Sequence, residues 1–163
     1  MFTSIPNFQK HTNIPEITNL RKQSELPEGK LPLNFLEPII DSIPGRGLLV
    51  PTRVGMDAGI VRVNSKKIVF SSAVAQGSRT SISRKLVSDL AKKISQSGAT
   101  PALINPVVLL PPGTSEAEVR RIMLGISKAA KDLGIIVGKG HTEVTSIVNE
   151  TTLIMTMFGF DPK

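Results

Sequence analysis

A strand, a turn and the start of a helix follow one another in the stretch ALINPVVLLPPGTSEAE, residues 102–118. The run Ala102–Leu110 is almost continuously apolar, which is typical of a strand buried on both faces. Pro111-Pro112-Gly113 ends this strand in a turn. Ser115 and Glu118 then have the spacing of a capping box, in which each side chain satisfies a free backbone amide.

The rest of the chain is predicted outward from this stretch. Apolar residues keep helical spacing from Val119 to Leu133, and Gly134 ends that helix in a left-handed conformation. Further elements are predicted as follows: a helix over Ile82–Ile94 stopped by Gly98, a short helix from Leu33 bent at Pro38, strands at Leu48–Val50, Ala58–Val63 and Lys67–Ser72 with a hairpin at Asn64-Ser65, a buried strand at Ile135–Val137, and a long strand over Thr151–Phe160.

Two helices with single apolar stripes would cover one face of a sheet. The segments Val107–Leu110 and Leu153–Met155 are apolar on both sides of the pleat, so we expect another domain or subunit to bury the second face. A charge at Leu109 or Met155 should then be costly. The alternative is a two-layer domain with one apolar outer face.

Composition limits the class of protein. The chain has 163 residues, 40% hydrophobic and 20% charged, which suits one soluble globular domain. Residues 1–30 are polar and interrupted by proline, which predicts a partly disordered arm. The absence of cysteine excludes disulfides and thiolate metal sites. No membrane-spanning run and no signal sequence is recognised, so a cytoplasmic location is expected.

The net charge of +7 favours anionic partners such as nucleotide phosphates, nucleic acid or acidic proteins. Nucleic-acid binding is not favoured, because Trp and Tyr are absent and the lysines are spread over several segments.

The candidate ligand-binding residues are concentrated in one segment, Gly138-Lys139-Gly140-His141-Thr142-Glu143. Two glycines after a strand allow a ligand to approach the backbone. The imidazole, hydroxyl and carboxylate that follow suit a phosphate or metal–phosphate site. The segment is not a P-loop, because the glycine spacing is one residue short and the hydroxyl after Lys139 is missing. The alternative is a glycine-containing loop with a solvated histidine.

Several segments in order resemble the aminoimidazole ribonucleotide (AIR) synthetase, or PurM-like, superfamily. Gly55–Val61 resembles its Gly-Glu/Asp-Asp-Ala-Ala segment, and Gly98–Pro101, Leu109–Thr114 and Gly140–Thr145 resemble later segments of its N-terminal domain. The resemblance extends from about Leu31 to Lys163 and is strongest to the AIR synthase-related branch. Relatives include the hydrogenase-maturation dehydratase, thiamine-monophosphate kinase and selenophosphate synthetase.

The resemblance implies an α+β domain over residues 31–163, with a mixed four-stranded sheet and helices on one face. In that family two such sheets form a barrel across a homodimer, and ATP with Mg²⁺ binds near the interface. A C-terminal domain normally follows. We expect that domain to be absent here, so an active enzyme would need a separate protein to supply it.

Departures from the family pattern predict a degenerate Mg-ATP site. Asp57 matches a family metal ligand, but Ala73 replaces the Asp that follows two hydroxyl residues. Lys92-Lys93 align with an Asn-Asp pair, unless a gap places Asp89 there. The resemblance thus gives Asp57 and Asp89 as metal ligands, and nucleotide-binding residues as follows: Gly138, Lys139, Gly140, His141, Thr142, Glu143 and Lys93.

The sequence therefore predicts a nucleotide-binding domain in which ATP and Mg²⁺ are both held weakly. It acts as a homodimer or with a separate C-terminal-domain protein. Catalytic residues and the acceptor substrate are not identified, and an active form would be an ATP-dependent synthetase or kinase. The alternatives are a non-catalytic dimeric scaffold or regulatory subunit and, less favoured, a basic nucleic-acid-binding domain.

Overall fold

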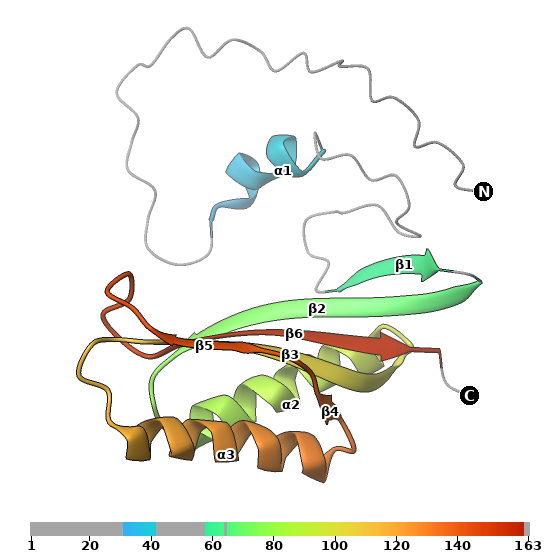
Figure 1. Cartoon of the computed structure of the whole chain (residues 1–163). Helices are drawn as coiled ribbons and strands as arrows, with labels where there is room; N and C mark the ends of the chain where they lie inside the picture. The colour runs from blue at the N-terminus through green and yellow to red at the C-terminus, as the bar shows by residue number, and fades with distance from the viewer. Residues whose placement is uncertain (1–30, 42–57, 64, 162–163) are drawn as a thin grey trace, which may run out of the picture. The chain divides into compact units, whose positions relative to one another are not determined.

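The computed structural model describes residues 31–41, 58–63 and 65–161, and the elements in these ranges belong to the unit Leu33–Lys163. Figure 1 shows their course. In chain order they are α1 (Leu33–Asp41), β1 (Gly59–Val63), β2 (Lys66–Gln76), α2 (Thr80–Gln96), β3 (Thr100–Leu110), α3 (Glu116–Asp132), β4 (Ile136–Val137), β5 (His141–Val144) and β6 (Thr152–Phe160). The predicted arm of residues 1–30, the predicted strand Leu48–Val50 and Asp57 lie outside the described residues.

The sheet is mixed, and β6 lies at its centre. The strand order is β1-β2-β6-β3-β4, and β5 also pairs with β3. β1, β2, β6 and β3 are antiparallel to their neighbours in this order, whereas β4 and β5 run parallel to β3. The predicted α+β class and mixed sheet are confirmed. The described sheet has six strands rather than four, because the two short strands β4 and β5 both add to β3.

A strand is present near Ile135–Val137 as predicted, but the prediction that it is buried was wrong. Only Ile135 is buried, and β4 consists of the exposed residues Ile136 and Val137. These two residues lie at the edge of the sheet, where one neighbour rather than two covers the strand. A short apolar run does not by itself distinguish an edge strand from a buried one.

Helices α2 and α3 lie side by side on one face of the sheet (Figure 1). Alternate residues of the central strands point toward these helices, as the period of two in a strand requires. The core contains Val69, Ile104, Val108, Leu153, Met155 and Met157 from the sheet, with Leu86, Leu90, Ile94, Ile122 and Ile126 from the helices. No helix in the described part of the chain is long and apolar enough to cross a membrane.

The helix ends follow the predicted signals with one difference. Ser115 is the N-cap of α3, and its hydroxyl accepts a hydrogen bond from the Glu118 amide at 3.3 Å. The Glu118 side chain does not complete the capping box but lies with its Oε1 3.5 Å from the Thr151 hydroxyl. Gly98 and Gly134 follow α2 and α3 with φ of +74° and +67°, which favours glycine at both positions.

The opposite face of the sheet, called the open face below, is covered by neither α2 nor α3 (Figure 1). Cross-strand pairing arranges it in rows that run across β2, β6 and β3. The central rows are Phe70–Phe158–Leu103, Ser72–Thr156–Asn105 and Val74–Ile154–Val107. The expected apolar character of both faces is therefore confirmed. Leu109 lies on the open face, whereas Met155 is fully buried in the core.

Gly125 on α3 tests the contact between the two helices. A Cβ atom at this position would lie 2.5 Å from Ser83 Oγ and 2.8 Å from Thr80 Cγ2 on α2. We predict that Gly125→Ala lowers the free energy of unfolding by about 1–2 kcal/mol, because overpacking outweighs the roughly 1 kcal/mol gained in helix propensity. Chemical denaturation measures this change.

Ser127→Ala is the matched control, since Ser127 is exposed on the same helix. It should leave the free energy of unfolding within about 0.5 kcal/mol of the starting value. A Gly125→Ala variant that is as stable as this control would contradict the close helix contact.

Candidate functional site

The segment Gly138–Glu143, called the glycine segment below, lies alongside β3. The Gly138 amide donates to the Ile104 carbonyl at 2.8 Å, and β5 then runs parallel to β3 over Val107–Leu110. Neither Gly138 nor Gly140 has a positive φ, so a left-handed turn does not require them. A Cβ at Gly140 would lie 2.1 Å from the Pro106 carbonyl oxygen. Gly140 is therefore needed for the close approach of the segment to β3, whatever else it does.

His141 and Glu143 form a pair on β5. They are two residues apart in a strand and so share one face. Their Nε2 and Oε2 atoms are 2.9 Å apart, and both side chains are exposed. Pairing of His141 with Val107 and of Glu143 with Leu109 places both on the side of the open face. Thr142 is exposed on the other side of the strand. The predicted loop histidine is thus part of a strand and faces the edge of the apolar surface.

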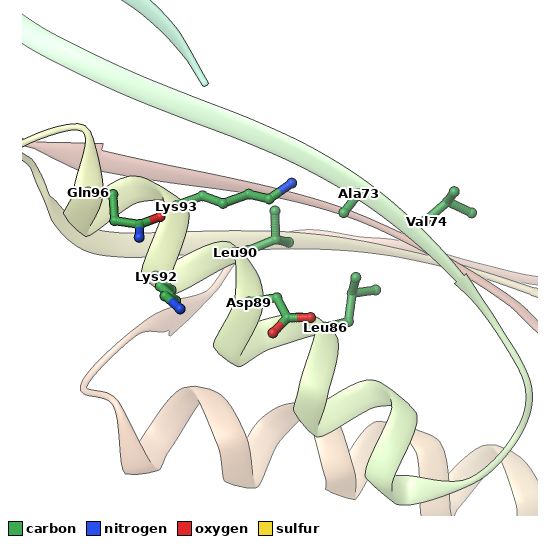
Figure 2. A pocket seen from close by; sticks show the side chains of 8 residues that line it. All are labelled: Ala73, Val74, Leu86, Asp89, Leu90, Lys92, Lys93 and Gln96. Atoms are coloured by element: carbon green, nitrogen blue, oxygen red, sulfur yellow. The ribbon is translucent and has the colours of Figure 1, made fainter. Parts of the chain in front are cut away.

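A second group of predicted residues lines a hollow of about 370 Å³ between α2 and β2. Figure 2 shows Lys93 extending along this hollow toward Ala73, with Asp89 and Lys92 farther from the strand. Asp89 forms an ion pair with Lys85 one turn earlier on α2, and both side chains are largely exposed. Such an exposed pair contributes little to stability, at most about 1 kcal/mol.

The resemblance aligns Ala73 and Lys92-Lys93 with family metal ligands, and the structure brings these positions together in one hollow. They present two ammonium groups, a methyl group and one paired carboxylate. Mg²⁺ prefers several oxygen ligands in octahedral geometry. Among the described residues no group of three His, Asp or Glu side chains could hold a metal ion. Asp57, the other predicted metal ligand, lies outside those residues.

The two groups lie on opposite sides of β6 in the sheet. The hollow borders β2, whereas the glycine segment borders β3, and β6 separates these strands. Three strand spacings, about 14 Å, therefore separate β2 from β5. One copy of the chain does not bring Lys93 into contact with Lys139 or His141.

Sequence reasoning missed the row Ser72–Thr156–Asn105, which crosses the centre of the open face. Ser72 Oγ and Thr156 Oγ1 are 2.9 Å apart. The available signal was the alternation within each strand: Ser71 is buried toward the helices, so its neighbour Ser72 must face the other way.

Comparison with known proteins identifies the family. A family model described as AIR synthase related protein, N-terminal domain, matches residues 55–160. The chain belongs to this family. The comparison with curated protein sequences gave no significant match.

Solved structures of this family's fold match most of the chain. Protein tt0281 from Thermus thermophilus has a TM-score of 0.65 at 21% identity over 79% of this chain and 42% of its own. AaThiL complexed with AMPPCP and TMP has a TM-score of 0.64 at 16% identity over 80% and 44%. T. maritima PurL complexed with ATP has a TM-score of 0.59 at 16% identity over 89% and 28%. The AIR synthase-related chain thus spans less than half of each of these structures.

The two glycines give a test of the segment's geometry. We predict that Gly140→Ala lowers the free energy of unfolding by about 1–3 kcal/mol, because the added methyl group would meet the backbone of Pro106. Gly138→Ala should cost less, because its Cβ would meet the movable Leu103 side chain at 3.1 Å. Denaturation midpoints compare the variants, and equal losses would contradict the placement of β5 against β3.

Proposed function

We propose that this AIR synthase-related chain is a nucleotide-binding domain that holds ATP phosphates mainly through lysine and backbone groups. The observation that carries this proposal is the charge of the hollow beside α2. Lys92 and Lys93 stand there with Ala73, where the family resemblance expects metal-binding side chains. Family membership and the nucleotide complexes of AaThiL and PurL support nucleotide as the ligand class.

Replacing metal-binding carboxylates by lysines changes how the phosphate charge is neutralised. An ammonium group neutralises phosphate directly, but it does not arrange water and oxygen ligands around the transferred group as Mg²⁺ does. Asp89 is paired with Lys85 and would have to leave that pair to bind a metal ion. We therefore propose a degenerate site in which Mg²⁺ adds little to ATP affinity.

A dimer would complete the site. The glycine segment borders β3 and the hollow borders β2, on opposite sides of β6, so a second copy is needed to bring the two groups together. The face also has a suitable size. Nine residues of β6 and five strand positions span about 30 × 20 Å, or roughly 600 Å², close to the ~800 Å² that each partner buries in a standard interface.

ATP titration calorimetry tests the nucleotide proposal. We predict measurable ATP binding that changes by less than tenfold, about 1.4 kcal/mol, when Mg²⁺ is added. Lys93→Ala and Lys139→Ala should each weaken binding about tenfold through loss of a charge-assisted contact. Lys128→Ala is the control, because Lys128 lies on α3 beside Asp132 and outside both groups.

A gain of tenfold or more with Mg²⁺ would show that carboxylates have restored a metal site. It would then refute the degenerate-site proposal. Equal effects of Lys128→Ala and Lys93→Ala would show that only net charge matters.

The open face favours a second candidate, a non-catalytic dimeric scaffold or regulatory subunit. This function needs the face but not the lysines. The solved structures are more than twice as long as the part this chain matches, and a separate C-terminal-domain protein is the partner we propose for either version. Absence of ATP binding at millimolar concentration, with or without Mg²⁺, would select the scaffold.

Self-association through the open face has its own test. We predict that light scattering gives twice the 17.5 kDa chain mass at micromolar concentration. Ile154→Lys should shift the protein to monomer, because it would bury an unpaired charge at the centre of the interface. Ile154 is 38% exposed in the single chain, so the domain itself should tolerate the change.

Leu124→Lys is the matched control. Leu124 is 69% exposed on α3, on the side of the sheet away from the open face. It should leave the mass unchanged. A dimer that Ile154→Lys leaves intact and Leu124→Lys dissociates would place the interface on the helices instead.

A further inference from the structure

A second hollow, of about 380 Å³, lies between α2 and the segment that follows α3, and it is called the outer hollow below. Its volume is at the lower end of the roughly 300–1,000 Å³ that is typical of small-ligand pockets. Part of its lining is apolar, and these residues are Ala91, Pro101, Leu133 and Ile135. Ala91 and Ile135 belong to the buried core, so this apolar part is held in place by the packing of the helices on the sheet.

The polar side of the outer hollow comes from a single face of α2. Ser88, Lys92 and Ser95 are spaced four and three residues apart, which places them on one face of the helix. They extend over about 10 Å along its axis. Within residues 31–41, 58–63 and 65–161 none of these three side chains forms a hydrogen bond or an ion pair. Two hydroxyls and an ammonium group are therefore free to donate to a ligand that enters the hollow.

The charge around the outer hollow favours an anion. Lys92 is the charged residue in its lining. The carboxylate of α2, Asp89, is held by Lys85 in an ion pair, and Asp132 at the end of α3 is held by Lys128. Neither carboxylate can pair with Lys92 without leaving its own partner.

The negative end of the α2 dipole, which would oppose an anion, is offset by a neighbouring cation. Lys67 Nζ donates to the Ser97 carbonyl at 3.1 Å, just after the last turn of α2. A cation in this place reduces the partial negative charge of the last carbonyls of a helix. The electrostatic balance at the outer hollow therefore remains positive.

We infer that the outer hollow binds a small organic anion with an apolar body, of the class of aryl-alkyl carboxylates. The Lys92 ammonium and the two serine hydroxyls donate to the carboxylate, and a charge-assisted bond of this kind is roughly twice as strong as a neutral one. The apolar body lies against the apolar part of the lining. A carboxylate suits the site better than a phosphate dianion, because one ammonium group balances one negative charge.

Lys92 also connects this site to the candidate nucleotide site, because it lines both hollows. Figure 2 shows Lys93 directed along the hollow beside β2, whereas Lys92 leaves α2 farther from Ala73. An ammonium group can serve only one of the two hollows at a time. This part of the inference rests on the proposed nucleotide function: an anion that holds Lys92 in the outer hollow weakens nucleotide binding, and nucleotide weakens anion binding by the same factor.

Titration of the ¹⁵N-labelled chain with 4-phenylbutyrate, followed by nuclear magnetic resonance, tests the anion site. We predict that the amide signals of Ser88, Lys92 and Ser95 shift and saturate with a Kd of about 1 mM, as expected for so small a ligand. The neutral analogue 4-phenylbutanamide should bind at least about fivefold more weakly, because it cannot form the charge-assisted bond.

Two substitutions separate the lysine from the overall charge. Lys92→Met keeps an apolar stem of similar length and should weaken 4-phenylbutyrate binding about tenfold. Arg84→Met is the matched control, because Arg84 is exposed on the same helix, outside the lining. It lies about 12 Å from Lys92 along the axis, beyond the Debye length at physiological salt, so the Kd should stay within about twofold.

Three results would overturn the anion site. The first is equal affinity for the neutral amide, which would show that apolar contact alone binds the probe. The second is unchanged affinity in Lys92→Met. The third is a set of shifts confined to residues of the open face such as Phe70 and Phe158, which would place the probe on the other side of the sheet.

ATP titration calorimetry with saturating 4-phenylbutyrate tests the coupling, with an equal concentration of sodium chloride as the control. We predict about threefold weaker ATP binding with 4-phenylbutyrate, and no such difference in Lys92→Met. An unchanged ATP affinity would overturn the coupling and leave the anion site standing. A complete lack of ATP binding would overturn the coupling together with the proposed function, whereas the magnetic resonance titration would still decide the anion site.

Discussion

The apolar character of both faces of β6 is the constraint on which the rest of the structure depends. Leu153, Met155 and Met157 point toward the helices and are fully buried. Ile154, Thr156 and Phe158 point to the open face between β2 and β3. Burial of an apolar side chain contributes about 1.5–3 kcal/mol, so leaving this second set in water would forgo a substantial part of the available stabilisation. Helices α2 and α3 cover only one face, which makes the other face the candidate surface for association.

This arrangement also positions the candidate site. The strand order places the lysine-lined hollow at β2 and the glycine segment at β3, on opposite sides of β6. Gly140 allows β5 to pack closely against Pro106. A glycine that the sequence suggested for ligand binding therefore has a structural role. The proposed dimer would account for the separation of these residues within a single chain.

Local signals in the sequence predicted most of the fold. The strands β3 and β6, the Ser115 cap and the glycines after α2 and α3 were predicted from signals between near neighbours, and each was confirmed. The exposure of Ile136 and the position of Glu118 beside Thr151 depend on elements far apart in the chain. Sequence spacing does not tell which strand occupies a sheet edge, as for Ile136, or which distant side chain lies beside a helix start, as for Glu118. These two features were therefore mispredicted.

The site was less predictable for the same reason. The hydroxyls of Ser72 and Thr156 and the amide of Asn105 come from three separate strands, and only the register of the sheet joins them. The pairing of His141 with Glu143 required β5 to be extended, which the two preceding glycines do not suggest. The family resemblance gave the nucleotide class, whereas the charge of the hollow required the packed structure.

Isotope-filtered nuclear Overhauser spectroscopy on a dimer of one labelled and one unlabelled copy tests the central claim most directly. The account predicts intermolecular contacts from the methyl groups of Val74, Val107 and Ile154, all on the open face. Intermolecular contacts confined to Leu124 on α3, or no intermolecular contacts at all, would contradict the burial of the open face between two copies.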